Sequence, residues 1–273
     1  MAHSTQPIGI FDSGIGGLTV ANAIYQRLPN ESTLYFGDTA HVPYGPRPAG
    51  QIRELSRQIS AYLLERGCKV IVIACNTATT AALNYLRNLW PDVPIIGTEP
   101  AIKPAAQATL TGKIGILATQ GTFKSDRYSS LTERFAADIT VFENPCKGLV
   151  SLIEMGKIDA SETNELLESI IYPMLEEGID TLVLGCTHYP FIRPIIEKIV
   201  GPDVAIIDPA PAIAKRVEQV LREHHLLNVT DEQAIHAYEV SGDGGHFLAL
   251  AQHLLQHPID LQTQIQAPFL MRG

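Results

Sequence analysis

The sequence predicts an α/β fold made of two similar domains, each with a mainly parallel sheet. First, short apolar runs typical of strands alternate along the chain with helix-like segments. Second, the segment Ile8–Phe11 recurs in similar form as Ile114–Leu117, which indicates a duplicated unit. Third, one apolar run ends at Cys75 and another at Cys186, each about 70 residues after its copy of the repeat. We therefore expect two domains related by a pseudo-twofold axis, with the functional site in the cleft between them.

Eight short apolar runs are expected to form strands. The run Val70-Ile71-Val72-Ile73 illustrates the signal, because four β-branched residues are too few for a buried helix and suit a strand covered on both faces. In chain order, the expected strands are Ile8–Phe11, Thr33–Phe36, Lys69–Ala74, Pro94–Gly97, Lys113–Leu117, Asp138–Phe142, Thr181–Leu184 and Val204–Ile207.

Helical patterns separate these strands, and several begin with Ser, Thr or Pro, which are favoured at helix starts. A turn at Ser241–Gly245 is expected to lead into the last helix. Two proline-containing stretches, Thr98–Pro104 and Asp208–Pro211, are the expected crossings between the domains. The clearest helical segments are Gln51–Glu65, Ala78–Leu89, Ser161–Glu176 and Pro190–Val200.

Composition limits the classes of function. The chain has 273 residues, of which 45% are hydrophobic and 18% are charged, and its net charge is −9. Because no basic run occurs, no nucleic-acid partner is expected. No segment has the pattern of a signal peptide or a membrane span, so we expect a cytoplasmic protein without a membrane partner. The four cysteines form no C-x-x-C pair, which predicts reduced thiols and no metal site.

Cys75 and Cys186 each stand at the carboxyl end of an expected parallel strand, where open α/β sheets bind their ligands. Two thiols across one cleft suit a reaction that removes a proton from one face of a carbon and returns one to the other. A helix N-terminus after each cysteine is expected to lower the thiol pKa. Asp12 ends the first strand and His188 closely follows Cys186, so each thiol is expected to have a proton-handling neighbour.

These residues also have purely structural interpretations. A lone cysteine after an apolar strand is commonly a small core residue, and this interpretation is kept for Cys68 and Cys146. Asp12 can cap a helix that begins near Gly17, and His188 can be an ordinary loop histidine. The coincidence of two cysteines in matching contexts with an acid and a histidine favours the catalytic interpretation.

The glycine cluster Gly14–Gly17 follows the first strand. A dinucleotide-binding fingerprint would need a further glycine where Thr19 stands, so no dinucleotide is expected here. The glycines are expected instead to let backbone amides approach a small anionic group, such as a carboxylate, at a helix N-terminus.

Four blocks of the sequence resemble the bacterial glutamate racemases, and they occur in that family's order. The resemblance spans the chain from Ile8 to about Asp208. It implies a racemase that needs no cofactor and interconverts L- and D-glutamate by a two-base mechanism, supplying D-glutamate for peptidoglycan. The four blocks are Ile10–Gly17, Tyr35–Asp38 with Val42–Gly45, Ala74–Ala78 and Gly185–Pro190.

The same resemblance implies roles for single residues. Cys75 and Cys186 are expected to be the two acid/base thiols, with Asp12 beside the first and His188 beside the second. The expected substrate-binding residues are Asp12, Ser13, Tyr44, Gly45, Asn76, Thr77, Thr187 and His188, with Thr119 and Thr122 of the second repeat as additional candidates.

The resemblance also implies a discontinuous first domain. Residues 1–97 and 208–273 are expected to form it and to carry Asp12 and Cys75. Residues 98–207 are expected to form the second domain, with Cys186 and His188. Glutamate is the expected partner, no cofactor is expected, and the oligomeric state stays open, with a homodimer as one option.

Three alternatives remain open at this stage. Aspartate and hydantoin racemases resemble this architecture and also use paired thiols, so the substrate can be a related amino acid. A cysteine hydrolase or acyltransferase would use Cys186 with His188 as its base and would need only one thiol. A binding protein without catalysis has no positive feature in its favour, because the sequence shows no basic patch or amphipathic tail.

Overall fold

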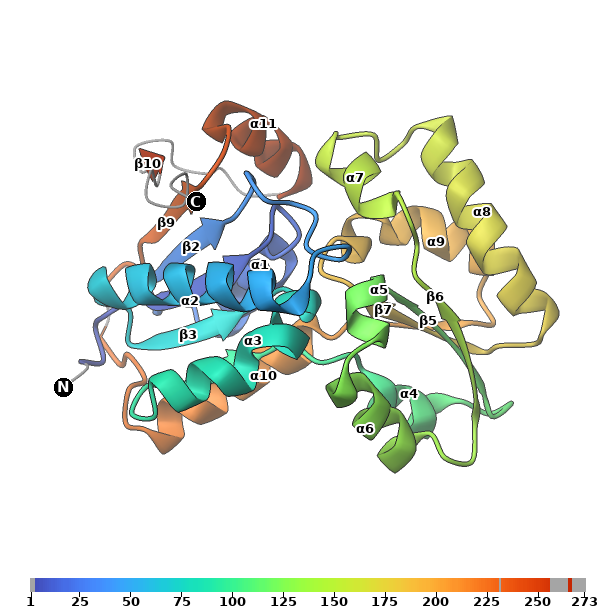
Figure 1. Cartoon of the computed structure of the whole chain (residues 1–273), viewed down its shortest axis with the longest axis horizontal. Helices are drawn as coiled ribbons and strands as arrows, with labels where there is room; N and C mark the ends of the chain where they lie inside the picture. The colour runs from blue at the N-terminus through green and yellow to red at the C-terminus, as the bar shows by residue number, and fades with distance from the viewer. Residues whose placement is uncertain (1–2, 231, 256–264, 267–273) are drawn as a thin grey trace.

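The chain folds around two parallel sheets, as the sequence predicts (Figure 1). This computed structural model describes residues 3–230, 232–255 and 265–266. One sheet has six strands and the other has four, and the described strand pairs are parallel in both. Helices cover both faces of each sheet, so the central strands are buried and rich in Ile, Val and Leu.

The first sheet has the strand order β10-β9-β2-β1-β3-β4. Its strands are β1 (Ile8–Asp12), β2 (Thr33–Gly37), β3 (Val70–Ile73), β4 (Ile95–Gly97), β9 (His236–Val240) and β10 (Ile265–Gln266). One face packs against α1 (Leu18–Arg27), α10 (Ala210–Glu223) and α11 (Gly244–Leu254). The other face packs against α2 (Ala49–Glu65) and α3 (Asn76–Leu89).

The second sheet has the strand order β6-β5-β7-β8. Its strands are β5 (Lys113–Ala118), β6 (Thr140–Asn144), β7 (Thr181–Gly185) and β8 (Ala205–Ile207). Helices α4 (Ile102–Ala108) and α6 (Asp126–Phe135) cover one face. Helices α7 (Leu149–Glu154), α8 (Ser161–Glu176) and α9 (Arg193–Val200) cover the other. The short helices α5 (Gln120–Phe123) and η1 (Tyr189–Ile192) follow β5 and β7.

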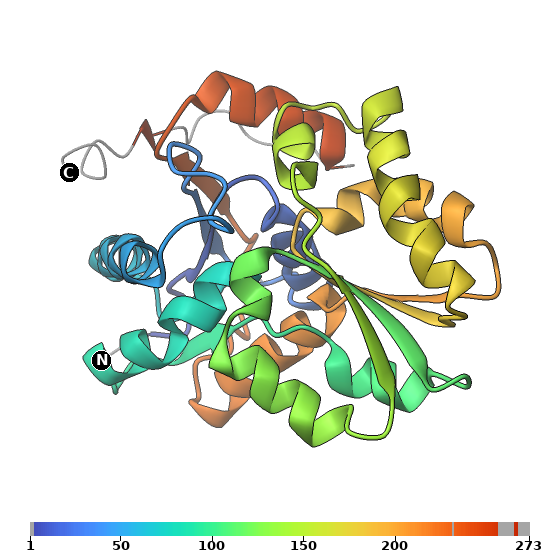
Figure 2. The same ribbon diagram turned by 45° about the vertical axis from the view of Figure 1, so that its right-hand side comes forward.

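The internal repeat of the sequence corresponds to a repeated strand order. The order β2-β1-β3-β4 in the first sheet matches β6-β5-β7-β8 in the second, so the two copies of the repeat, β1 and β5, occupy equivalent positions. Cys75 follows β3 and Cys186 follows β7, which are also equivalent strands. Figure 2 shows the two sheets side by side, with α3 and α5 between them.

All eight expected strands are present, with ends that shift by one or two residues. Strands β9 and β10 were not expected from the sequence. The helix expected over Pro190–Val200 was only partly right, because η1 occupies Tyr189–Ile192 and the regular helix α9 begins at Arg193. Pro194 explains this start, since proline fits the first turn of a helix but not its interior.

The strands of the first sheet come from residues 8–97 and 236–266, and those of the second come from residues 113–207. The exact domain limits stay a prediction, and residues 256–264 and 267–273 lie outside the described part of the chain. Across the described residues, no helix is both long and apolar enough to cross a bilayer.

A buried ion pair lies at the amino-terminal ends of β2 and β3 in the first sheet. Lys69 precedes β3 and Glu31 precedes β2; Lys69 Nζ lies 2.5 Å from Glu31 Oε2, and both side chains are almost fully buried. The ammonium also bonds the carbonyl of Ser4, and Glu31 Oε1 accepts the N–H of Asn228 at 2.7 Å. A pair in this position holds four chain segments together, and each charge depends on the other for compensation.

Replacing Lys69 by Met should therefore lower the free energy of unfolding by about 3–5 kcal/mol, because the buried Glu31 carboxylate loses its counter-ion. The double variant Lys69→Met/Glu31→Gln removes both charges and should recover most of that loss. Chemical denaturation of the three proteins measures the effect. A single variant that is as stable as the double variant would contradict it.

Candidate active site

The carboxyl ends of β3 and β7 bring Cys75 and Cys186 to one small cavity. Its volume is ≈ 10 Å³, which is about the space of a single water molecule. Most of the lining comes from segments that directly follow strands, where parallel sheets present their functional residues. The lining residues are Ser13, Pro43, Tyr44, Gly45, Cys75, Asn76, Thr77, Thr119, Val150, Cys186, Thr187 and His188.

This cavity contains all the substrate-binding residues expected from the sequence except Asp12. Thr119 also lines it, whereas Thr122 lies behind Thr119, with 3.3 Å between their hydroxyl oxygens. Asp12 lies beneath the wall: its Oδ1 accepts a hydrogen bond from the Thr187 hydroxyl at 3.1 Å, and its Oδ2 accepts the N–H of Gly14 at 3.0 Å. Pro43 and Val150 were not expected.

Cys75 is itself the N-cap of α3. The sequence suggested that Asn76 and Thr77 would cap a helix starting near Ala78, but the helix begins at Asn76 and the Cys75 sulfur accepts the N–H of Ala78 at 3.4 Å. The thiol donates toward Ser13 Oγ, 3.8 Å away. The thiol is thus fixed between the first turn of α3 and the loop after β1.

The expected lowering of the Cys75 pKa by the helix is outweighed. Burial raises the pKa of this thiol well above its ordinary value, and the nearby carboxylate of Asp12 raises it further, while the Ala78 N–H lowers it by less. The expectation failed because the sequence shows the helix start but not how completely the sulfur is removed from water. In this state Cys75 holds its proton at neutral pH.

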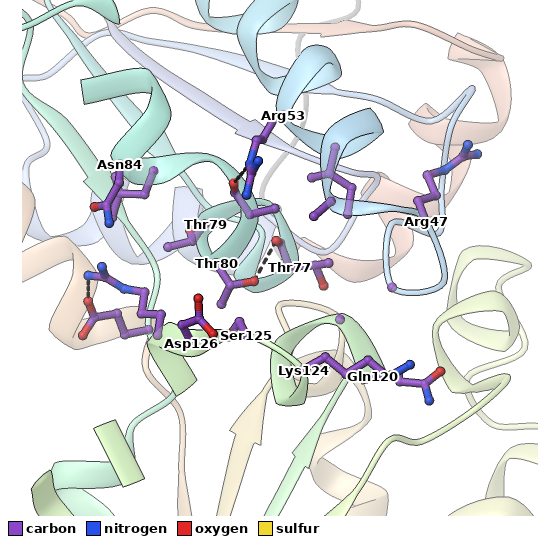
Figure 3. A pocket seen from close by; sticks show the side chains of 18 of the residues that line it. Arg47, Arg53, Thr77, Thr79, Thr80, Asn84, Gln120, Lys124, Ser125 and Asp126 are labelled. Carbon is purple, nitrogen blue, oxygen red and sulfur yellow. Dashed lines mark hydrogen bonds and ion pairs between the residues drawn. The ribbon is translucent and has the colours of Figure 1, made fainter. Parts of the chain in front are cut away.

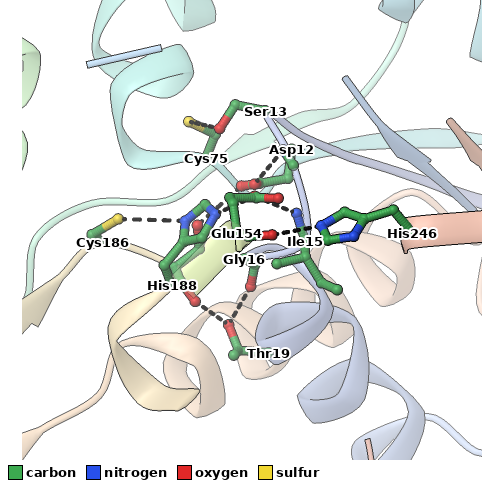
Figure 4. Close-up of polar contacts among 12 residues, drawn as sticks. Asp12, Ser13, Ile15, Gly16, Thr19, Cys75, Glu154, Cys186, His188 and His246 are labelled. Atoms are coloured by element: carbon green, nitrogen blue, oxygen red, sulfur yellow. Dashed lines mark hydrogen bonds and ion pairs between the residues drawn. The ribbon is translucent and has the colours of Figure 1, made fainter. Parts of the chain in front are cut away.

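Cys186 has a histidine partner. The Cys186 sulfur lies 3.7 Å from His188 Nδ1, and His188 Nε2 lies 2.6 Å from Glu154 Oε1 (Figure 4). Burial alone would lower the pKa of His188, but its hydrogen bonds to Cys186 and Glu154 together raise it well above the ordinary value. A protonated His188 therefore carries one N–H toward the thiol and the other toward the carboxylate.

Glu154, at the end of α7, is a site residue that the sequence did not reveal. Its Oε1 also accepts the N–H of Ile15 at 2.9 Å, and its carbonyl accepts a bond from His246 of α11 at 2.7 Å. A single glutamate at a helix end carries no motif, so no local signal marked it. The glycine cluster before α1 therefore does bind a carboxylate, but that carboxylate is the protein's own Glu154 side chain.

The same contact explains why the cluster contains glycines. A Cβ atom added to Gly14 would collide with the Glu154 carboxylate, and one added to Gly16 would collide with the His188 ring. The residues at these positions must lack a side chain because charged groups from the second-sheet side press against the loop.

Tyr44 is held in the wall by a second buried carboxylate. Its hydroxyl donates to Asp38 Oδ2 at 2.5 Å, and Asp38 Oδ1 accepts the Ser241 hydroxyl at 2.6 Å. Asp38 belongs to a block that was recognised in the sequence without being given a role. Ser241 follows β9, so the unexpected strand also supports the site.

Asn76 is the polar side chain best placed to receive a ligand. It lines the cavity and is only 3% exposed. Within the described structure, neither polar atom of its amide has a hydrogen-bond partner. A buried amide that is unpaired in this way costs free energy unless a ligand or water satisfies it.

The four cysteines are free and buried. Among the residues that the structure describes, no three His, Cys, Asp or Glu side chains are grouped so that they could hold a metal ion.

The Cys75 thiol should titrate above the ordinary value for cysteine, about 8.5, because burial and Asp12 disfavour the thiolate. The measurement is the ultraviolet absorbance of thiolate against pH in the wild type, with the Cys75→Ser variant subtracted to isolate this thiol. A Cys75 thiolate that forms mainly below about pH 8 would contradict the expected direction.

Glu154→Gln should lower the pKa of His188, because the carboxylate that favours the charged ring is gone. The imidazolium of the wild type should persist to higher pH than that of the variant. NMR titration of the His188 ring protons tests this, with Glu162→Gln as a control that removes an exposed glutamate of α8. Equal titration of His188 in the two variants would show that Glu154 does not set its charge.

Known proteins resemble this chain over most of its length. The family model described as Asp/Glu/Hydantoin racemase matches residues 18–217. The glutamate racemase of Stutzerimonas stutzeri (strain A1501) is 49% identical over 243 residues, which is 89% of this chain and 91% of that protein. The crystal structure of glutamate racemase isoform RacE1 from Bacillus anthracis has a TM-score of 0.85 and 33% identity, and covers 97% of this chain and 98% of its own.

The crystal structure of glutamate racemase from Francisella tularensis in complex with D-glutamate has a TM-score of 0.83 and 32% identity, and covers 96% of this chain and 97% of its own. The match in sequence family extends from α1 into α10, and the match in fold includes both sheets. The chain therefore belongs to the Asp/Glu/hydantoin racemase family.

Proposed function

We propose that the protein racemises glutamate without a cofactor, with Cys75 and Cys186 as the two acid/base groups. The observation that carries the proposal is that two thiols, from equivalent strand ends of two sheets, line one small cavity. A single thiol would suffice for hydrolysis or acyl transfer, whereas inversion at a carbon needs one group on each side.

In one direction, the Cys75 thiolate takes the proton from the α-carbon of glutamate, and the electron pair of the broken C–H bond stays on the substrate as a carbanion. The Cys186 thiol then gives its proton to the opposite face of that carbon. Each sulfur ends in the protonation state that the other had, so the reverse direction begins with the roles exchanged. The sum of protons on enzyme and substrate does not change.

The raised pKa of Cys75 sets a requirement for this step, because the thiol must lose its proton before it can act as a base. The ammonium group of bound glutamate brings a positive charge into the cavity, and a nearby opposite charge favours the thiolate. On the other side, His188 faces Cys186 at 3.7 Å and can pass a proton to or from that sulfur.

The carboxylates and ammonium group of glutamate need polar partners in the cavity. The unpaired amide of Asn76 and the hydroxyls of Ser13, Thr77 and Thr187 are suited to bind them. Donors fixed before the reaction stabilise the carbanion as charge moves onto the substrate carboxylate, because they need no rearrangement.

The cavity is too small to admit glutamate as it stands. A water-sized sphere reaches only ≈ 10 Å³ inside it, about the space of a single water molecule. The two halves of the site must therefore separate to bind glutamate and close again for the reaction, which also excludes water from the carbanion.

Glutamate is proposed as the substrate because the relatives described above are glutamate racemases, one of which binds D-glutamate. We further propose that the product supplies D-glutamate for peptidoglycan and that the reaction takes place in the cytoplasm. Aspartate is the rival substrate, and only its direct comparison with glutamate separates the two.

The test is to incubate the purified protein with L-glutamate in deuterated water, without added cofactor, and follow optical rotation and deuterium at the α-carbon together. The wild type should lose rotation while gaining deuterium, and Cys75→Ala and Cys186→Ala should each lose racemisation by several orders of magnitude. Cys68→Ala removes a buried thiol outside the cavity and should keep the activity.

Each contrary outcome has a distinct meaning. Substantial racemisation by Cys75→Ala would end the two-thiol proposal. A wild type that racemises aspartate but not glutamate would change the proposed substrate and leave the proposed mechanism in place. Hydrolytic or acyl-transfer activity that survives in Cys75→Ala would favour the single-thiol alternative.

A further inference from the structure

A second and much larger pocket lies directly outside the catalytic cavity. Its volume is ≈ 950 Å³, and its walls come from α2 and α3 of the first-sheet side and from α5 and α6 of the second-sheet side (Figure 3). Gly45 and Thr77 line both spaces, so the two are neighbours separated by a single layer of residues. We call the larger pocket the vestibule.

The layer between the vestibule and the cavity is a contact between the two halves of the molecule. The hydroxyl oxygens of Thr77, on α3, and Thr119, after β5, lie 2.7 Å apart. A Cβ atom added to Gly121 would lie 2.9 Å from Thr77 Cγ2 and 3.1 Å from the carbonyl oxygen of Gly45. The halves touch here through hydroxyls and glycine backbone, so a small separation of the two would join the vestibule to the thiols.

The vestibule is rich in positive charge. Arg47 and Arg53 donate their Nε–H groups to the carbonyls of His41 and Ala81, at 2.6 and 2.8 Å, and Arg134 lies over the ring of Phe135. Because these partners are neutral, the arginines keep their charge. The exposed Lys124 adds a fourth cation.

Two acidic residues also line the vestibule. Glu99 is paired with Arg127 and so cancels a charge that would otherwise add to the field. Asp126, in the first turn of α6, is the other. The four cations described above therefore exceed the remaining acid by three charges, in a protein whose net charge is −9.

We infer that the vestibule is the route by which the substrate reaches the thiols, and that its basic side chains draw in an anionic amino acid. The inference rests on the proposed function. Glutamate carries two carboxylates and one ammonium group, so its net charge is negative at neutral pH. An acidic protein would repel this substrate from most of its surface, and the vestibule supplies a local field of the opposite sign beside the layer that separates it from the thiols.

Such a field acts through concentration and encounter rate. A cleft lined by one sign of charge raises association rates by about 10- to 1,000-fold, and the effect falls steeply with ionic strength. The screening length is ~30 Å at 0.01 M salt and ~3 Å at 1 M, so the field of the vestibule charges extends much further at low salt than at high salt.

The test compares Lys124→Gln and Lys124→Glu with the wild type in the racemisation of D-glutamate, using an enzyme-coupled assay for L-glutamate. At about 0.01 M ionic strength, Lys124→Glu should lower kcat/KM by roughly three- to tenfold, with Lys124→Gln in between. The difference should disappear near about 0.5 M salt. The value of kcat at saturating glutamate should change less than about twofold, since the chemical step is untouched.

Two further variants fix the sign and the location of the effect. Asp126→Asn removes the negative charge and should raise kcat/KM at low salt. Lys198→Glu makes the same charge reversal on an exposed lysine of α9, on the opposite face of the second sheet, and should have little effect. Circular dichroism of each variant checks that it is folded.

The outcomes separate this inference from the proposed function. If the wild type fails to racemise glutamate, the proposed function itself is wrong. A wild type that racemises glutamate while Lys124→Glu matches Lys198→Glu at low salt overturns the vestibule as the entrance. A fall in kcat for Lys124→Glu without a salt-dependent change in kcat/KM would also overturn it, because the lysine would then act on the reaction and not on the approach of the substrate.

Discussion

The rest of the site depends on the contacts that the Glu154 carboxylate makes with Ile15 and His188. This carboxylate accepts the N–H of Ile15 at 2.9 Å and lies 2.6 Å from His188 Nε2, so it joins the loop after β1 to the turn after β7. The histidine is buried and its pKa is raised, so its charge needs this partner. The bond also turns the other ring nitrogen toward Cys186, because the two nitrogens point in opposite directions. The glycines at positions 14 and 16 follow from the same contact, since no side chain fits between the loop and this pair.

The two thiols occupy equivalent places in the fold but have different surroundings. Cys75 caps α3 and has the Ser13 hydroxyl and the Asp12 carboxylate near it, whereas Cys186 faces a charged histidine. At Cys75 the helix N-terminus and burial act in opposite directions, and burial has the larger effect on the pKa. A duplicated fold therefore need not give two identical acid/base groups. Such a difference suits a reaction in which one sulfur must be charged while the other is neutral.

The protein uses its two spaces for different physical tasks. The small cavity has room for only about one water molecule, and electrostatic interactions are stronger where little water can enter. The vestibule is large and positively charged, and it lies where the two halves meet through Thr77, Thr119 and the glycines. Separating these tasks lets the thiols stay buried without isolating them from an anionic substrate.

The sequence by itself determined the class of fold, the positions of eight strands along the chain and the placement of both cysteines at strand ends. These features depend on local patterns, such as the β-branched run Val70–Ile73 and the repeat at Ile8 and Ile114, which chain neighbours reveal. The resemblance to the glutamate racemases also indicated most of the residues that line the cavity. Strand β9, which lies between β10 and β2, was not predicted from the sequence, yet Ser241 directly after it supports Tyr44 through Asp38.

Only the tertiary structure decided the features that depend on distant parts of the chain. Glu154 is 34 residues from His188, and the basic side chains of the vestibule come from separate segments, so no basic patch was visible in the sequence. The direction of the Cys75 pKa shift was likewise missed, since a strand-end cysteine followed by a helix predicts a lowered pKa and only the packing around the sulfur reverses it. Burial and long-range charge are properties of the folded arrangement, because each is a sum over atoms that the chain brings together only when it folds.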